Sequence, residues 1–132
     1  MARIIRILAI VVLISILVTS ALAFTIGVRQ KSNIGDYLVD GKGITLYYFV
    51  NDLPKKSTCF GDCSSTWRPF YAEWIDVPKE LNDQDFDQIG RIDGQYQTTY
   101  KGRPLYLYIG DHSEGDVNGN GVNGMWFAMR VH

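Results

Sequence analysis

The pattern of apolar and polar positions divides this 132-residue chain into an apolar leader and a body of short segments. Residues 7–18 are almost wholly apolar, which predicts an N-terminal hydrophobic helix. In the body, short runs of β-branched and aromatic residues alternate with Gly, Asn, Asp and Lys, as is typical of antiparallel strands and turns. The clearest runs lie at 44–50, 95–100, 104–109 and 125–131. We therefore predict a mostly β, small antiparallel domain behind the leader.

The strand pattern of the body occurs twice, at an offset of 59 residues. The aligned pairs include several rare residue types: Gly35 and Gly94, Tyr37 and Tyr96, Lys42 and Lys101, Leu46 and Leu105, Tyr47 and Tyr106, Phe49 and Tyr108, Asp52 and Asp111, Trp67 and Trp126. This self-similarity predicts two pseudo-symmetric hairpin repeats, about 35–70 and 94–129, packed around a pseudo-twofold axis. A unit this short is not expected to bury its apolar face alone, so each repeat needs the other.

The repeated residues have predicted structural roles. Side chains two apart on a strand share one face, so Tyr47 and Phe49 should lie together, as should Tyr106 and Tyr108. Asp52 or Asp111 follows each pair, where an Asp side chain can accept backbone N–H bonds and close a turn. Trp67 and Trp126 are expected to cover the aromatic pairs.

The leader predicts export. Residues 1–23 combine Arg3 and Arg6, an apolar run and the small-x-small sequence Ala21-Leu22-Ala23, as in a secretory signal peptide. An uncleaved membrane anchor is the alternative, because a helix over 7–26 would span about 30 Å of hydrocarbon. Both place the body outside the cytoplasm, secreted or at the extracytoplasmic face of the membrane. Residues 24–33 are predicted to be a linker and 34–132 a single two-repeat domain.

Charge and cysteine usage narrow the function classes. The net charge is −1, and loss of Arg3 and Arg6 makes the body more negative, so no electrostatic footprint for nucleic acid is expected. Contact with a membrane is expected only through the N-terminal segment. Cys59 and Cys63 flank Phe-Gly-Asp, which predicts a disulfide in an oxidising compartment. Metal or redox chemistry is the alternative for this pair.

Two further groups of residues could carry chemistry. Asp52 and Asp111 could act together as the carboxylates of an envelope hydrolase, although turn closure accounts for their placement. Residues 116–121 fit the first half of a calcium loop, but Phe127 occupies the twelfth position, where a bidentate acid belongs. The candidate calcium ligands are Asp111, Glu114, Asp116, Asn118 and Asn120. No catalytic residue is predicted, and no cofactor other than this calcium alternative.

Several motifs occur in the order and spacing of a known family. They are Y-Y-F-V-N-D at 47–52, Y-L-Y-I-G-D at 106–111, the C-F-G-D-C-S-S-T-W segment at 59–67 and G-V-N-G-M-W-F at 121–127. The chain resembles the secreted-repeat family of predicted bacterial and archaeal lipoproteins with the Y-x-[FWY]-x-x-D motif, whose function is not established. Many members carry a lipid-anchor cysteine after the leader, which this chain lacks. The resemblance implies an exported, surface-associated domain of two repeats. We interpret the body as a binding or structural module, with a cell-envelope protein or glycan as the expected partner.

Overall fold

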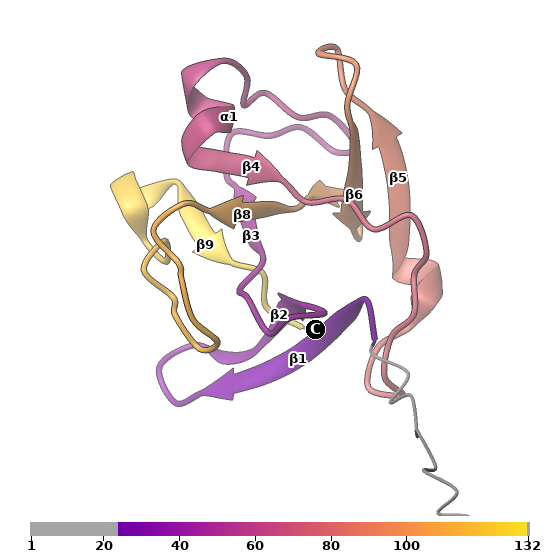
Figure 1. Cartoon of the computed structure of the whole chain (residues 1–132), viewed down its shortest axis with the longest axis vertical. Helices are drawn as coiled ribbons and strands as arrows, with labels where there is room; N and C mark the ends of the chain where they lie inside the picture. Colours follow the sequence, from indigo (N-terminus) through magenta and orange to yellow (C-terminus); the bar gives the residue numbers. More distant parts are fainter. Residues whose placement is uncertain (1–23, 132) are drawn as a thin grey trace, which may run out of the picture.

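The computed structural model describes residues 24–131, so the predicted N-terminal helix and signal peptide lie outside the described residues. Short strands dominate the fold (Figure 1). In chain order the elements are β1 (Ile26–Lys31), β2 (Gly35–Asp40), β3 (Tyr47–Phe49), α1 (Asp62–Thr66), β4 (Trp67–Pro69), the 3-10 helix η1 (Asp83–Asp85), β5 (Phe86–Gly90), β6 (Tyr96–Tyr100), β7 (Arg103–Pro104), β8 (Tyr106–Tyr108), the 3-10 helix η2 (Val122–Gly124) and β9 (Trp126–Ala128). The predicted mostly β, antiparallel fold is confirmed. No helix within residues 24–131 has the length and apolar character needed to cross a bilayer.

Three small antiparallel sheets build the domain. The central sheet has four strands in the order β4-β8-β3-β9. The hairpin β1-β2 and the three-stranded sheet β5-β6-β7 lie on different sides of it (Figure 1). Each flanking sheet comes from one repeat, whereas the central sheet draws strands from both.

The two repeats meet at the centre of the four-stranded sheet. Strands β3 and β8 are antiparallel with Tyr47 opposite Tyr106, and these two residues are equivalents in the repeat. The pseudo-twofold axis therefore passes between them. Strand β4 of the first repeat pairs with β8 of the second, and β9 of the second pairs with β3 of the first. Because each repeat contributes the edge strand of the other, neither can complete its half of the sheet alone.

The outer hairpins follow an offset of 60 residues instead of 59. Ile26 lies opposite Asp40 in the first repeat, and Phe86 lies opposite Tyr100 in the second. The structural counterpart of Tyr37 is therefore Gln97, and the sequence alignment of Tyr37 with Tyr96 is wrong. The shared Lys-Gly of the turns produced that alignment, but the turn of the first repeat is one residue longer, since Val39 bridges Thr45 while Thr99 pairs with Pro104.

The predicted linker over residues 24–33 is also wrong, because it contains strand β1 (Ile26–Lys31). All six residues of β1 pair with β2, and Ile26 is fully buried. Isolated apolar residues among charged ones in this segment did not form a run, so the alternation was missed. Residues 73–81 contain neither a helix nor a strand.

The central strands are buried on both faces, which gives the domain two apolar clusters. Leu46 and Leu105 point into one cluster and Tyr47 and Tyr106 into the other, because neighbouring residues of a strand face opposite sides. The first cluster also contains Ile26, Leu38, Phe70, Leu81, Phe86, Tyr100 and Met129. The second contains Ile34, Tyr37, Val39, Cys59, Trp67, Trp126 and Ala128. The repeat motif lies in the second cluster.

Candidate functional site

The Tyr and Asp residues of the motif bond across the two repeats. The hydroxyl of Tyr47 donates to Oδ2 of Asp111, and the hydroxyl of Tyr106 donates to Oδ2 of Asp52, each at 2.6 Å. We call these the crossed Tyr–Asp pairs. Burial raises the pKa of both tyrosines far above the ordinary value, and the carboxylate that each one faces raises it further. Both phenols therefore remain protonated donors over the whole physiological range.

The second oxygen of each Asp holds the loop that follows its strand. Oδ1 of Asp52 accepts from the backbone N–H of Thr58 at 2.7 Å and from its hydroxyl at 2.9 Å. Oδ1 of Asp111 accepts from the backbone N–H of Asn118 at 3.0 Å. Burial raises the pKa of both carboxyl groups, while the donated hydrogen bonds oppose that rise. Each Asp thus joins a loop to the opposite repeat.

This geometry bears on the hydrolase alternative. Asp52 lines a surface cavity, but Asp111 does not line the same one. Both oxygens of each carboxylate accept hydrogen bonds from side chains or backbone of the protein. A general acid or base must instead reach a proton of the substrate. The structure therefore does not bring the two aspartates into one cleft as hydrolase carboxylates.

The two tryptophans lie at the centre of a stack of four aromatic rings. The ring centroids of Trp67 and Trp126 lie 3.9 Å apart, and the two ring planes make an angle of 1°. Trp126 stacks on Phe49 at 4.2 Å, and Trp67 stacks on Tyr108 at 4.3 Å. Each tryptophan thus stacks on a ring of the other repeat, and it meets the tyrosine of its own repeat edge-on, Trp67 with Tyr47 and Trp126 with Tyr106. Sequence reasoning missed this exchange of stacking partners, because nothing in a single repeat indicates on which copy its Trp will stack.

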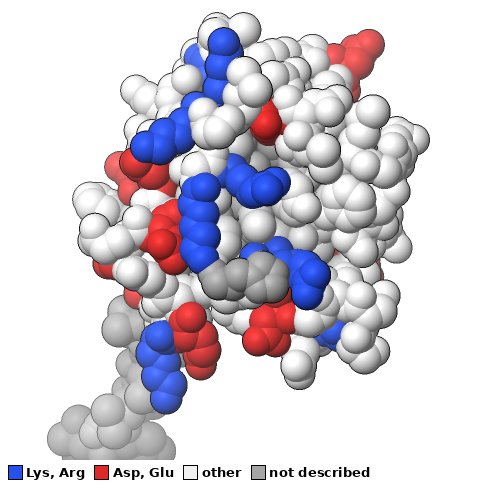
Figure 2. Space-filling view, turned by 180° about the vertical axis from the view of Figure 1, so that it is seen from behind, with Lys and Arg blue, Asp and Glu red and all other residues white. Residues whose placement is uncertain are grey.

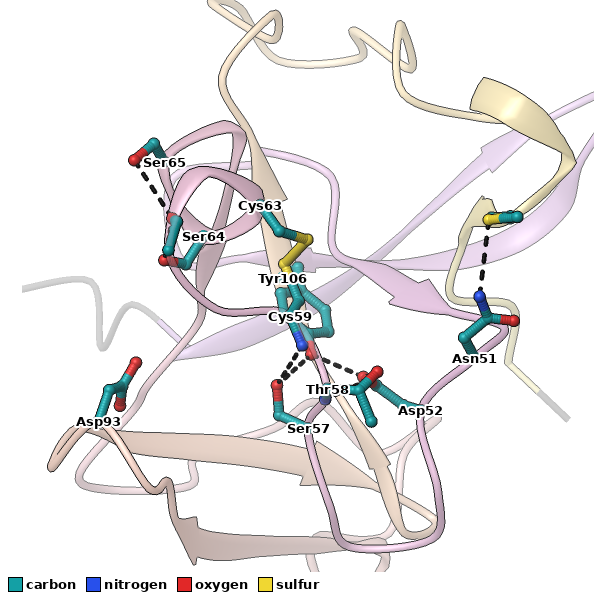
Figure 3. The surroundings of a disulfide bond; sticks show 12 residues. Asn51, Asp52, Ser57, Thr58, Cys59, Cys63, Ser64, Ser65, Asp93 and Tyr106 are labelled. Atoms are coloured by element: carbon teal, nitrogen blue, oxygen red, sulfur yellow. Dashed lines mark hydrogen bonds between the residues drawn. A yellow bond between two sulfur atoms is a disulfide. The ribbon is translucent and has the colours of Figure 1, made fainter.

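The disulfide predicted between Cys59 and Cys63 is present and lies beside the Tyr106–Asp52 pair (Figure 3). Ser57 bonds to this Tyr–Asp pair, since the Ser57 hydroxyl is 2.6 Å from the Tyr106 hydroxyl. Because the Tyr106 hydroxyl already donates to Asp52, the Ser57 hydroxyl is the donor of this bond. The carboxylate, phenol and serine therefore form one buried chain of hydrogen bonds.

Arg91 extends this chain and was missed by sequence reasoning. Its side chain is fully buried and pairs with Asp93 at 2.9 Å. The guanidinium also donates to Ser57, Gln97 and the carbonyl of Cys59, each at 2.8 Å. The hydrogen bonds that the Arg91 guanidinium donates to the Asp93 carboxylate lower the pKa of Asp93. An isolated arginine in a strand-turn segment carries no sequence signal of burial, so only the fold reveals its role.

The side chains of the candidate calcium residues bond to other groups of the protein. Oδ2 of Asp116 accepts from the backbone N–H groups of His112 and Ser113, which lower its pKa. Oδ1 of Asn120 accepts from Ala128, and the side-chain amide of Asn118 donates to a backbone carbonyl. Glu114 instead pairs with Arg29 at 3.4 Å. Within residues 24–131, no three acidic, His or Cys side chains form a group that could hold a metal ion.

A basic cluster is the surface feature that sequence reasoning did not find. Lys101 and Arg103, from the β6–β7 hairpin, line a cavity of about 390 Å³ together with the loop after β3. Lys55 of that loop packs beside Gly102. The two segments are far apart in the chain, so a scan for runs of positive charge could not detect the cluster.

Comparison with known families agrees with this two-repeat architecture. The model of a family described as a secreted repeat of unknown function matches residues 29–71 and again residues 88–130. The chain belongs to this family of secreted repeats. Its two matched segments begin 59 residues apart, as the internal alignment predicts. No curated protein and no solved structure matches the chain.

Proposed function

We propose that this secreted-repeat protein acts as a rigid, non-catalytic binding module at the cell envelope. The crossed Tyr–Asp pairs carry the proposal. The polar atoms that recur in both repeats bond to each other across the junction, with Tyr47 on Asp111 and Tyr106 on Asp52. Groups that recur in both repeats and bond to each other in this way have a structural role. We therefore assign binding to the loops that differ between the repeats.

The surface supports a binding role better than a purely structural one. Trp74 is 76% exposed and Ile92 is 86% exposed, although both are large apolar side chains that proteins usually cover. Both lie outside the strands. Exposed aromatic and apolar side chains on loops of a rigid scaffold are typical of contact surfaces.

Sedimentation with cell-envelope material tests the proposal. Purified folded protein is mixed with envelope from the producing organism, and the bound fraction is compared with that of urea-unfolded protein. We expect saturable binding by the folded protein only, with no change in the mass of the envelope glycans. Absence of saturable binding would contradict the binding role. Release of glycan fragments that stops in Asp52→Asn or Asp111→Asn would show catalysis and overturn the proposal.

A further inference from the structure

The cavity beside the basic cluster has the size and the lining of a small-ligand site. Its volume of about 390 Å³ lies within the range of typical ligand pockets, about 300–1,000 Å³. Its lining includes the apolar residues Val50, Leu53 and Pro104 and the two cations Lys101 and Arg103. A ligand there would meet both apolar surface and positive charge.

Lys55 adds a third cation next to the cavity, where it packs beside Gly102 of the lining. Its backbone N–H donates to the carbonyl of Gly102 at 2.7 Å, which places the loop after β3 against the β6–β7 hairpin. Among residues 24–131, no acidic side chain forms an ion pair with Lys55, Lys101 or Arg103. Asp52 also lines the cavity, but both of its oxygens accept hydrogen bonds from other groups. These bonds do not remove the charge of Asp52, but the three cations outnumber this one carboxylate, so the cavity keeps a net positive charge.

Aromatic rings hold two of these cations without neutralising them. The guanidinium of Arg103 lies 4.5 Å from the ring centroid of Tyr48, and the ammonium of Lys101 lies 5.3 Å from that of Tyr100. Cation–π contacts restrict the side chains and leave their charge in place. The cations are thereby partly positioned before a ligand arrives.

The backbone is strained at two of the three cations. Lys55 has φ of 58° and Lys101 has φ of 49°, in the left-handed region that glycine adopts far more readily than lysine. The third such residue, Asn123, has φ of 54°, but asparagine enters this region much more often. Strained residues that persist in a fold are often found at functional sites. Lys101 lines this cavity, and Lys55 packs beside Gly102 of its lining.

The equivalent place in the other repeat lacks the cluster. Glu114 aligns with Lys55 and packs beside Gly43, the equivalent of Gly102. It forms an ion pair with Arg29, so its charge is matched there. Figure 2 shows basic side chains across the middle of one face of the molecule, with acidic side chains beside and below them. The scaffold is duplicated, but the free positive charge at this cavity belongs to one copy.

We propose that this cavity binds a phosphate-bearing sugar or polyol unit. This proposal rests on the envelope binding proposed above and specifies the class of its ligand. Arg103 offers a planar fork that matches phosphate oxygens in pairs, while Lys55 and Lys101 supply point charges. Three cations match the double charge of a phosphate better than the single charge of a carboxylate. The apolar side chains of the lining cover the C–H face of the sugar or polyol.

NMR titration of the folded protein with glucose 1-phosphate tests the site, with glucose as the uncharged control. We expect saturable shifts of the amide signals around the cavity with the phosphate and none with glucose. Lys101→Gln and Arg103→Gln should each weaken binding about fivefold or more. Lys42→Gln is the matched control, because it removes the same charge from the equivalent hairpin turn of the other repeat, and it should bind like the wild type.

A second pair of variants separates binding from folding. Lys101→Gly removes the charge and relieves the strained backbone, so binding should weaken while the melting temperature does not fall. Asn123→Gly relieves a similar strain away from the cavity and should leave binding unchanged. Circular dichroism melts recorded beside the titrations provide both readouts.

The outcomes distinguish this proposal from the function on which it rests. Equal loss of glucose 1-phosphate binding in Lys42→Gln and Lys101→Gln would show that binding depends only on the overall charge, and it would refute the proposed site. Binding to vesicles of phosphatidylglycerol without binding of glucose 1-phosphate would overturn it in favour of a membrane surface. Envelope sedimentation unaffected by Lys101→Gln would refute this site and leave the binding module standing. Amide shifts with glucose 1-phosphate, together with no sedimentation of the protein with the envelope, would support the site and refute the binding module.

Discussion

Tyr106→Phe is the substitution that most clearly separates the crossed Tyr–Asp pairs from ordinary aromatic packing. It removes a single oxygen and keeps the ring that packs edge-on against Trp126. The lost hydroxyl donates to Asp52 and accepts from Ser57, both at 2.6 Å. The substitution therefore breaks the bond between the repeats and the chain that leads to Arg91.

The expected loss in the free energy of unfolding follows from the two hydrogen bonds of the Tyr106 hydroxyl. A hydrogen bond to a charged acceptor contributes roughly 1.5–3 kcal/mol. Ser57 is 5% exposed, so its hydroxyl is left without an acceptor away from water, at a further cost of roughly 1–3 kcal/mol. Because rearrangement of the serine recovers part of this, we expect Tyr106→Phe to lower the free energy of unfolding by about 3 kcal/mol. Stabilities of domains are about 5–15 kcal/mol, so the loss is large.

Urea unfolding followed by tryptophan fluorescence measures this loss. Tyr108→Phe is the matched control, since it removes a hydroxyl from the same strand and restores the residue found at Phe49 in the other repeat. It should change the free energy of unfolding by less than about 0.5 kcal/mol. If Tyr106→Phe were as mild as Tyr108→Phe, the Tyr106–Asp52 bond would not contribute to holding the repeats together.

Three other perturbations test separate parts of the structure. Burial raises the pKa of Asp52 and Asp111 in the folded state, so their contribution to the unfolding free energy should rise as pH falls from neutral towards the ordinary value of 3.8. Because the lowered pKa values of Asp93 and Asp116 act in the opposite direction, this contribution is measured as the difference from the double variant with Asn at positions 52 and 111, and an equal pH dependence in that variant would contradict it. Replacement of Cys59 and Cys63 by Ser should cost only about 2 kcal/mol, because the disulfide closes a very short loop, and a complete loss of folding in the denaturation curve would disprove this. Gly119→Ala should lower stability by about 1–3 kcal/mol, since its Cβ would lie 2.7 Å from the ring of a stacked tryptophan, and an unchanged melting temperature would mean that the stack can move aside.

Much of the fold is predictable from the sequence because the repeat occurs twice in one chain. The alignment of Tyr47 with Tyr106 correctly predicted two equivalent strands and a pseudo-twofold axis. The family match independently supports the two units. The exchange of Trp67 and Trp126 between repeats was not predictable, since the alignment is the same whether each Trp contacts its own copy or the other.

The remaining errors have local causes. Strand β1 has no strand signal in the sequence, because Ile26 and Val28 are its only large apolar residues and polar residues follow them. Tyr96 was aligned with Tyr37 because the Lys-Gly turns match, yet Tyr96 is 56% exposed and Tyr37 is buried. The cluster of Lys55, Lys101 and Arg103 depends on a contact between segments that are distant in the chain. Such long-range contacts leave no periodic pattern in a single sequence.

Nuclear Overhauser contacts among the aromatic ring protons test the interlocked repeats most directly. The account predicts contacts of Trp67 with Tyr108 and Trp126, and of Trp126 with Phe49, together with Tyr47 close to Tyr106 across the axis. Contacts of Trp67 with Phe49, and of Trp126 with Tyr108, in the absence of contacts between the two tryptophans would contradict the exchange. In that case each repeat would be a self-contained unit.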